Sequence, residues 1–296
     1  MVTVRGARPG TSLEVLTGYF ALALRSEGKS PKTVSFLMQH LRLFRGYACS
    51  QGWEDIRDVD AWALRQFLAY VRDPENLLGT RRCPRAHGPT RAFHHYKALR
   101  AFFDFLKRER LILEYPLENV RLRCPPPQNL SVYSQEELAR INRLCALDFK
   151  VAPTKKSRAV AARNHALFLA VLDTGLRLAE LAGLLVDDVD PETGVIRVRR
   201  GKGGKGRLVR VGQESRRCLM RYLAHRIGES PQLWLSQEGK PLTVHGVEQV
   251  FDRLCHRADV KFRGVHAFRR SWCAAAIRNG ANLRMVQLLG GWSTLA

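Results

Sequence analysis

The sequence has no long apolar run. None of its 296 residues lies in a stretch that approaches the roughly 20 apolar residues a helix needs to cross a bilayer. The first residues, MVTVRGARPGTS, carry positive charges with no apolar segment behind them, so they do not form a secretory signal. Both absences argue against a membrane-bound or secreted protein and predict one that stays in the cytoplasm.

Cysteine is scarce and scattered. The seven cysteines are an odd number and lie mostly inside apolar patterns: Cys49, Cys83, Cys124, Cys145, Cys218, Cys255 and Cys273. Reduced thiols fit this distribution better than a disulfide framework. A zinc site is an alternative use of some of them, but its candidate ligands match no closed zinc pattern, so we expect no metal: Cys83, His87, His94 and His95.

Acidic residues are few compared with basic ones. The chain has 27 Asp and Glu against 49 Lys and Arg, which gives a net charge of +22 and a pI near 10.4. Residues 1–130 carry +9 of this charge and residues 131–296 carry +13. Two basic halves are typical of a protein that grips one polyanion with both, and nucleic acid is the leading candidate. A merely soluble basic surface is the alternative.

The first 118 residues show helical apolar spacing from about residue 11 onward. Ser12 fits the N-cap of a first helix, and Ser30 followed by Pro31 fits the start of a second. Two more helices are predicted over about 60–71 and 89–106. The sequence therefore predicts a small helical bundle. Its outer faces carry basic side chains: Arg42, Arg45, Arg91, Lys97, Arg100, Lys107 and Arg108.

A proline-rich segment, CPPPQ at 124–128, predicts a stiff extended linker. We place the domains at 1–123 and 134–296, with the linker at 124–133. After it, Ser134 begins a helix with acidic residues in its first turn, and a further helix is expected to run to Leu184 after the break at Gly175. Alternation over 195–199 and 207–211 predicts a β-hairpin. The fold class is mainly α with a small antiparallel sheet, an N-terminal helical bundle followed by an α+β domain.

Two segments of the second half put a basic residue next to a glycine break. TGLRLAEL, at 174–181, places Arg177 three residues before Glu180 at the start of a helix. GKGGKG, at 201–206, places Lys202 on the turn of the predicted hairpin. It does not match an ATP-binding phosphate loop, because strands flank it and no Ser or Thr follows either lysine. Taken singly, the segments also fit a surface ion pair and a solvated basic turn.

Two further segments lie near the end of the chain. HAFRR, at 266–270, projects His266 and Arg269 from one face of a first helical turn, an arrangement that suits an anionic oxygen. LLGGWS, at 288–293, places Trp292 after a Gly-Gly break. A capping histidine and a core tryptophan are the plain structural alternatives.

In this order the four segments resemble those of the tyrosine recombinase (phage integrase) family, of the Xer or Cre two-domain type. TGLRLAEL resembles the box of the first catalytic arginine, GKGGKGR the lysine hairpin, HAFRR the HxxR box and LLGGW the LGH/W segment. The helical first half resembles the family's SAM-like core-binding domain. The resemblance implies a catalytic set composed of Arg177, Glu180 in support, Lys202, His266, Arg269 and Trp292.

The resemblance also implies an activity, site-specific recombination of the kind used by mobile elements. DNA is cut and rejoined by transesterification through a 3′-phosphotyrosyl link, with no metal and no cofactor. Arg177, Arg269 and Trp292 would contact the non-bridging phosphate oxygens, Lys202 would protonate the departing 5′ oxygen, and His266 would assist proton transfer. The partner is double-stranded DNA, for which we expect contacts from basic residues: Arg42, Arg45, Arg91, Lys97, Arg100, Lys205, Arg207 and Arg270.

The sequence departs from the family at the nucleophile. The resemblance places that tyrosine near position 301, about nine residues beyond Trp292, and none of the seven tyrosines follows His266. We therefore expect a truncated chain that binds DNA without cutting it and stays a monomer or weak oligomer, whereas the complete protein forms a homo-tetramer on DNA. A natural non-catalytic DNA-binding remnant is the alternative. A type IB topoisomerase is disfavoured by the helical first domain and by TGLRLAEL.

Overall fold

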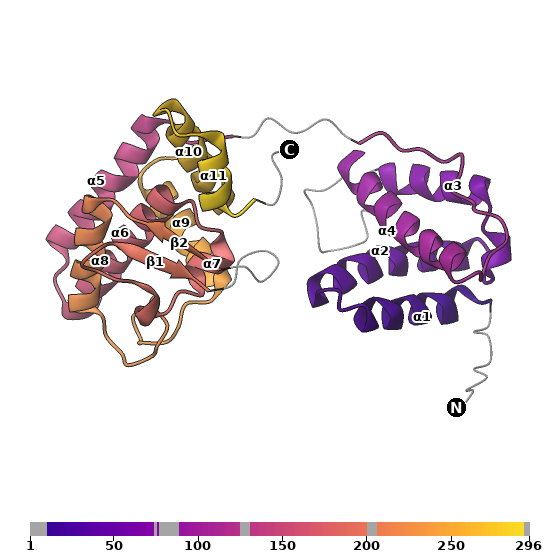
Figure 1. Cartoon of the computed structure of the whole chain (residues 1–296), viewed down its shortest axis with the longest axis horizontal. Coiled ribbons are helices and arrows are strands. Elements are labelled where there is room, and N and C mark those ends of the chain that lie inside the picture. Colours follow the sequence, from indigo (N-terminus) through magenta and orange to yellow (C-terminus); the bar gives the residue numbers. More distant parts are fainter. Residues whose placement is uncertain (1–10, 74–75, 77–88, 125–130, 200–205, 293–296) are drawn as a thin grey trace. The chain divides into compact units, whose positions relative to one another are not determined.

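The computed structural model describes residues 11–73, 76, 89–124, 131–199 and 206–292. The chain forms two compact units, residues 1–127 and 128–296 (Figure 1). The division falls inside the segment predicted to link two domains. Within the described residues, no helix is both long and apolar enough to span a membrane.

The first unit is a helical bundle. It comprises α1 (Leu13–Ser26), α2 (Pro31–Ser50), the 3₁₀ turn η1 (Ile56–Asp58), α3 (Ala61–Arg72) and α4 (Pro89–Arg108). The Ser12 hydroxyl accepts a hydrogen bond from the amide of Val15 at 3.3 Å, and the Ser30 hydroxyl accepts one from Thr33 at 3.2 Å. Both predicted N-caps are therefore confirmed, and each satisfies an amide that the helix leaves without a partner.

Aromatic side chains fill the centre of this bundle. Phe44 of α2, Phe67 of α3 and the neighbours Phe102 and Phe103 of α4 are fully buried. The rings of Phe44 and Phe67 meet edge to face with centroids 5.1 Å apart. Each buried phenylalanine contributes on the order of 2 kcal/mol of transfer free energy, so these side chains hold α2, α3 and α4 together.

The second unit is also mostly helical, and its described residues contain one small sheet. Its elements are α5 (Gln135–Val151), α6 (Lys155–Thr174), α7 (Leu178–Ala182), η3 (Val186–Asp188), β1 (Val195–Val198), β2 (Arg207–Arg210), α8 (Gln213–His225), α9 (Val244–Arg257), α10 (Val265–Arg278) and α11 (Leu283–Gly290). The strands pair antiparallel, with Val198 opposite Arg207. The predicted fold class, mainly α with a small antiparallel sheet, is confirmed.

Helix α6 lies in the middle of this unit. Most of its side chains are buried from Ala159 onward, and many of them, Phe168 included, belong to the hydrophobic core of the unit. The helix ends at Thr174 and is capped by Gly175, whose φ of +56° is a left-handed conformation that glycine adopts without strain. A Cβ atom at Gly175 would lie 2.3 Å from the ring of Trp272, so the side chain of α10 also requires glycine there. This junction brings the end of α6, the start of α7 and the middle of α10 together.

The helix that follows is shorter than predicted. α7 ends at Ala182, two residues before Leu184, and Gly183 caps it. The chain then turns, and the carbonyl of Leu184 accepts a hydrogen bond from the amide of Leu233 at 2.8 Å. The pairing with a segment almost fifty residues further on takes the place of another helical turn.

Candidate active site

Arg177 lies at the start of α7, directly after the Gly175 break. Its guanidinium donates to Oε1 of Glu180 at 2.8 Å, and its own amide donates to Oε2 of the same carboxylate at 2.9 Å. The Glu180 side chain is 5% exposed and that of Arg177 is 23% exposed. The predicted i,i+3 pair therefore exists, but it is a largely buried pair and not the surface ion pair of the plain alternative.

Arg269 projects from the first turns of α10 and is buried. Its two terminal nitrogens donate to the carbonyl oxygens of Gly175 and Gly290. Burial, and after it the positive charge of Arg177, lowers the pKa of Arg269 to about 10, so the side chain stays charged at neutral pH. A buried guanidinium held by neutral carbonyls keeps its full positive charge available to an anion.

Trp292 follows the end of α11 and closes the site on one side. Its ring is stacked on that of Trp272, with centroids 6.3 Å apart, and the Arg269 guanidinium lies 4.3 Å from its centroid. Gly290 makes the close approach possible, since a Cβ there would lie 2.0 Å from the Trp292 ring. Trp292 is 38% exposed, so it is a partly solvent-facing wall and not a core tryptophan.

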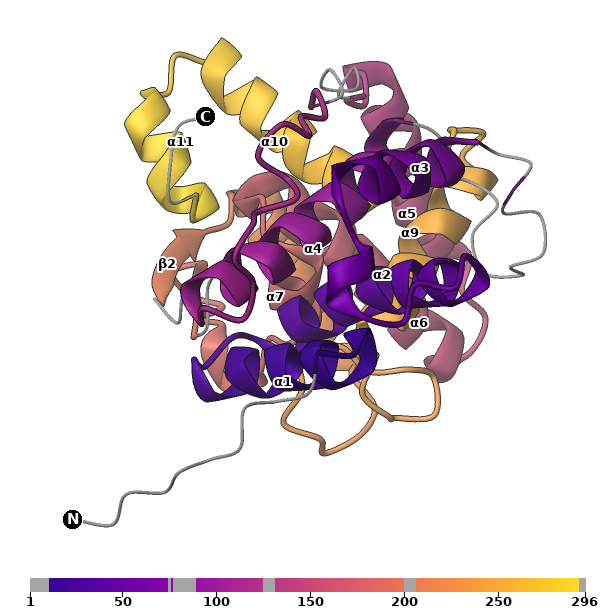
Figure 2. The same cartoon turned by 90° about the vertical axis from the view of Figure 1, so that its right-hand side faces the viewer.

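Three arginines hold three consecutive carbonyls at the C-terminal turn of α11, which ends in the cap residue Gly291. Arg207 donates through Nε to Leu289 at 2.7 Å, Arg269 donates to Gly290, and Arg177 donates to Gly291 at 2.6 Å. The three residues come from β2, α10 and the start of α7. Figure 2 shows α11 beside both α10 and β2, which agrees with these contacts.

Glu180 is the one carboxylate hydrogen-bonded to this group of arginines among the described residues. Burial alone would raise its pKa, but hydrogen bonds from Arg207 and Arg177 outweigh burial and lower the pKa of Glu180 to about 2. The cluster of Arg177, Arg207, Arg269 and Glu180 thus holds three positive charges and one negative charge. The surplus gives the cluster the electrostatics of an anion site, and a phosphodiester is an anion of suitable charge.

The remaining predicted residues are placed less deeply or lie outside the described residues. His266 is exposed on the first turn of α10, three residues from the buried Arg269. Arg270 is half-buried and donates to the carbonyl of Ser131 at 3.1 Å. Lys202 and Lys205 fall on residues that the structure does not describe, so their roles stay predictions.

The family model of the phage integrase family matches residues 135–296, which hold all of these residues. The chain belongs to the phage integrase family. Among curated relatives it is similar to tyrosine recombinase XerC of Halalkalibacterium halodurans, 28% identical over 293 residues that cover 94% of this chain and 88% of the relative. It is also similar to tyrosine recombinase XerD of Pseudomonas putida, 32% identical over 229 residues that cover 73% of this chain and 71% of the relative. The resemblance read from the four segments is confirmed.

Solved structures show the same fold. A lambda integrase dimer bound to a COC′ core site has a TM-score of 0.72 to this chain at 16% identity, covering 96% of each chain. The Tn1549 transposon integrase in complex with circular intermediate DNA has a TM-score of 0.72 at 19% identity, covering 97% of this chain and 93% of its own. The helical bundle and the α+β unit of this recombinase both lie within these matches.

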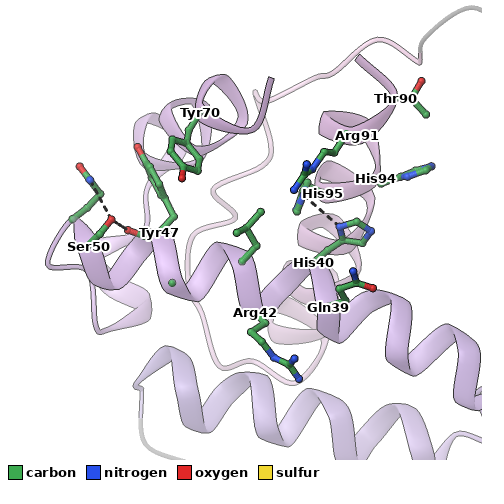
Figure 3. A pocket seen from close by; sticks show the side chains of 13 residues that line it. Gln39, His40, Arg42, Tyr47, Ser50, Tyr70, Thr90, Arg91, His94 and His95 are labelled. Carbon is green, nitrogen blue, oxygen red and sulfur yellow. Dashed lines mark hydrogen bonds between the residues drawn. The ribbon is translucent and has the colours of Figure 1, made fainter. Parts of the chain in front are cut away.

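A hollow between α2 and α4 collects several polar residues of the first unit (Figure 3). Arg42 of α2 and Arg91 of α4, both predicted to contact DNA, line it together with Gln39 and His94. Arg42 is exposed and Arg91 half-buried. The structure therefore brings two of the predicted DNA contacts into one concave surface.

The other predicted contacts of the first unit lie elsewhere. Arg45 donates to Glu14 of α1 at 2.7 Å. Lys97 lies 4.7 Å from the centroid of the Phe93 ring, and Arg100 pairs with Asp104 at 3.8 Å. By helical spacing Lys97 and Arg100 project from a face of α4 other than the one that carries Arg91.

Two histidines that line the hollow, the half-buried His40 and the buried His95, form a pair that sequence reasoning did not find. Nδ1 of His40 and Nε2 of His95 are 3.4 Å apart, and Nδ1 of His95 is buried with no hydrogen-bond partner. Burial, followed by neighbouring histidines and Arg91, lowers the pKa of His40 to about 4 and that of His95 to about 3. In the described part of the chain no group of three or more His, Cys, Asp or Glu side chains could hold a metal. Cys83 and His87 of the zinc alternative lie outside it.

Proposed function

We propose that this protein is a site-specific recombinase that cuts and rejoins DNA by metal-free transesterification through a 3′-phosphotyrosyl intermediate. The observation that carries the proposal is the surplus of positive charge around Glu180. Arg177 and Arg269 approach one turn from two elements, and a single carboxylate balances them. Fixed cations of this kind stabilise the charge that spreads over the non-bridging oxygens of a phosphate during transfer.

Each residue has a part in the chemical step. The tyrosine expected near position 301 gives up its phenol proton with the help of His266, and its oxygen attacks phosphorus. The bond to the 5′ oxygen breaks, and that oxygen takes a proton from Lys202. The 3′-phosphotyrosyl link retains a phosphodiester, so the reverse attack by a 5′ hydroxyl rejoins the strand without ATP. Arg177, Arg269 and the Trp292 indole contact the non-bridging oxygens, and His266 assists proton transfer.

Double-stranded DNA is the proposed substrate, and the complete protein is proposed to act as a homo-tetramer on it. Support comes from the basic charge of both halves and from relatives whose solved structures are DNA complexes, among them a lambda integrase tetramer bound to a Holliday junction. Residues 1–296 contain no tyrosine after Tyr222. We propose that these residues alone bind DNA without cleaving it, as a monomer or weak oligomer in the cytoplasm. A non-catalytic DNA-binding role is the second candidate.

A strand-joining assay separates the two candidates and needs no tyrosine from the protein. The substrate is a nicked duplex, selected from a random pool by its affinity for this chain. Its 3′ end at the nick carries a p-nitrophenyl phosphodiester in place of phosphotyrosine. Attack by the neighbouring 5′ hydroxyl forms the new phosphodiester and releases p-nitrophenolate, which needs no proton to leave.

Arg177→Ala and Arg269→Ala should each lower the rate of joining by on the order of 10²-fold or more while DNA affinity changes little. Each substitution removes a positioned cation that acts mainly on the transition state. The rate is measured by p-nitrophenolate absorbance and the affinity by fluorescence anisotropy of the same duplex. DNA binding by the wild-type chain with no joining would favour the non-catalytic role, and equal loss of joining and affinity would make the two arginines part of the DNA grip alone.

A further inference from the structure

Arg207 is the first residue of β2 and lies opposite Val198 of β1. Sequence reasoning predicted that it contacts DNA, as a basic residue beside the glycine-rich turn. Its side chain is only 12% exposed, and each of its three guanidinium nitrogens donates to an acceptor of this chain. A side chain bound in this way serves the internal structure of the site.

Two of these nitrogens grip Glu180. Nη1 donates to Oε1 at 2.9 Å and Nη2 donates to Oε2 at 2.7 Å, a two-pronged pair that fixes the plane of the carboxylate. The same two oxygens accept the guanidinium and the amide of Arg177. The orientation of Arg177 is therefore set by a carboxylate whose own orientation Arg207 sets.

The third nitrogen reaches the C-terminal turn of α11. Nε of Arg207 donates to the carbonyl of Leu289, one residue before the carbonyl that Arg269 holds. A Cβ at Gly291 would lie 3.1 Å from Nη1 of Arg207 and 3.2 Å from Nη1 of Arg177, so both guanidinium groups pack directly on this turn. Gly291 has a φ of +67°, which also favours glycine there. Arg207 thus contacts both Glu180, which orients Arg177, and the turn whose carbonyl Arg269 holds.

We propose that Arg207 is a positioning residue of the phosphate site, which aligns Arg177 through Glu180 and Arg269 through the Leu289–Gly291 turn. This inference rests on the proposed function. Arg207 also begins the strand that follows residues 201–206, so it ties that strand to both catalytic arginines. Lysine cannot replace it fully, since an ammonium group lacks the planar fork that matches a carboxylate.

Arg207→Gln and a matched control, Arg210→Gln, test the proposal in the strand-joining assay. Arg210 lies on the same strand, is exposed and donates to the carbonyl of Thr193 at 3.0 Å, so its removal costs the same charge at the surface. For Arg207→Gln we expect the rate at saturating DNA to fall on the order of 10²-fold, because both arginines lose alignment. The half-saturating DNA concentration should change less than about twofold, since all three guanidinium nitrogens are already bound within the chain. Arg210→Gln should join at nearly the wild-type rate.

A double-mutant cycle with Arg177→Ala then tests whether Arg207 acts through Arg177. In the Arg177→Ala background, Arg207→Gln should lower the joining rate by a clearly smaller factor than it does in the wild type. The reason is that Arg207 no longer has an Arg177 side chain to align. If Arg207→Gln acted only by unfolding the protein, its effect on the joining rate would be the same factor in both backgrounds and would multiply with that of Arg177→Ala. If Arg207→Gln fails to fold, Arg207→Lys keeps the positive charge and is expected to lower the rate about tenfold at unchanged half-saturation.

Three results would overturn the proposal. Joining by Arg207→Gln at the wild-type rate would show that the alignment is unnecessary. A parallel loss of rate and DNA affinity would make Arg207 a DNA contact, as the sequence predicted. Independent, multiplying effects in the cycle would separate Arg207 from Arg177. A wild-type chain that binds the duplex without joining it would instead overturn the proposed function, and with it any role of Arg207 in that function.

Discussion

Glu180 is the residue on which the site depends most, because it is the shared partner of two arginines. Replacing it by glutamine leaves the charges of Arg177 and Arg207 without a counter-charge in a nearly buried position. Breaking a buried pair in this way costs about 3–5 kcal/mol, so Glu180→Gln should lower the free energy of unfolding by that order. Urea denaturation followed by circular dichroism measures it. Glu14→Gln is the control, since Glu14 is 80% exposed in its pair with Arg45 and should cost less than about 1 kcal/mol.

The pH dependence of this contribution follows from the lowered pKa of Glu180. The folded-state pKa of about 2 lies below the ordinary value of 4.5, so the folded protein favours the ionised carboxylate. The stabilisation is complete above about pH 4.5 and is lost as the pH falls toward 2. Between pH 5 and 8 the difference in unfolding free energy between wild type and Glu180→Gln should therefore stay constant; a difference that changed steeply there would contradict the pairing.

At the residue scale, the sequence could predict that four residues come together in one site: Arg177, Glu180, Arg269 and Trp292. Each of them lies in a short segment with a recognisable spacing. It could not predict that Arg207 turns inward. Arg207 is 27 residues from Glu180 and 82 from Leu289, and these contacts depend on how β2 packs beside α7 and α11. In sequence, a basic residue next to a glycine-rich turn has the signature of a DNA contact.

At the scale of elements, local capping chemistry decided where helices begin. Ser12, Ser30 and Ser134 each accept an amide hydrogen bond at the predicted N-caps, and Pro31 lies at the first position of α2. Helix ends were less predictable. The early end of α7 depends on the hydrogen bond between Leu184 and the amide of Leu233, which no local pattern reveals.

The histidine pair of α2 and α4 predicts that the first unit loses stability in acid. His40 and His95 have folded-state pKa values of about 4 and 3, below the ordinary 6.5, so the folded bundle favours their neutral forms. Their stabilising contribution is complete above about pH 6.5 and is lost as the pH falls toward 4 and then 3. The local opening free energy of α4 should therefore fall by up to about 1.4 kcal/mol per pH unit for each histidine.

Hydrogen exchange of α4 peptides, corrected for the intrinsic pH dependence of exchange, measures this fall. His95→Gln should flatten it below pH 6, and His256→Gln, an exposed histidine of the other unit, should leave it unchanged. An equally steep fall in His95→Gln would show that other groups govern the acid sensitivity.

At the scale of the whole molecule, the net charge of +22 is spread over both halves. DNA affinity should therefore fall steeply with salt, since each neutralised phosphate releases counterions. Arg42, on the rim of the α2–α4 hollow, is a candidate phosphate contact. Arg42→Gln should weaken binding and lower the slope of log affinity against log salt by about 1. Arg57→Gln is the matched control, because Arg57 already pairs with Asp55 at 2.8 Å. An identical slope in the wild type, Arg42→Gln and Arg57→Gln would exclude Arg42 as a phosphate contact.

We propose that the cluster of Arg177, Arg207, Arg269 and Glu180 belongs to a site that transfers a phosphodiester without a metal. The most direct test is p-nitrophenolate release from the activated nicked duplex by residues 1–296 in the presence of EDTA. We expect one p-nitrophenolate for each strand joined, no release when the neighbouring strand lacks its 5′ hydroxyl, and loss of both signals in Arg269→Ala. Tight binding of the duplex by the wild-type chain with no release and no joining would contradict the claim.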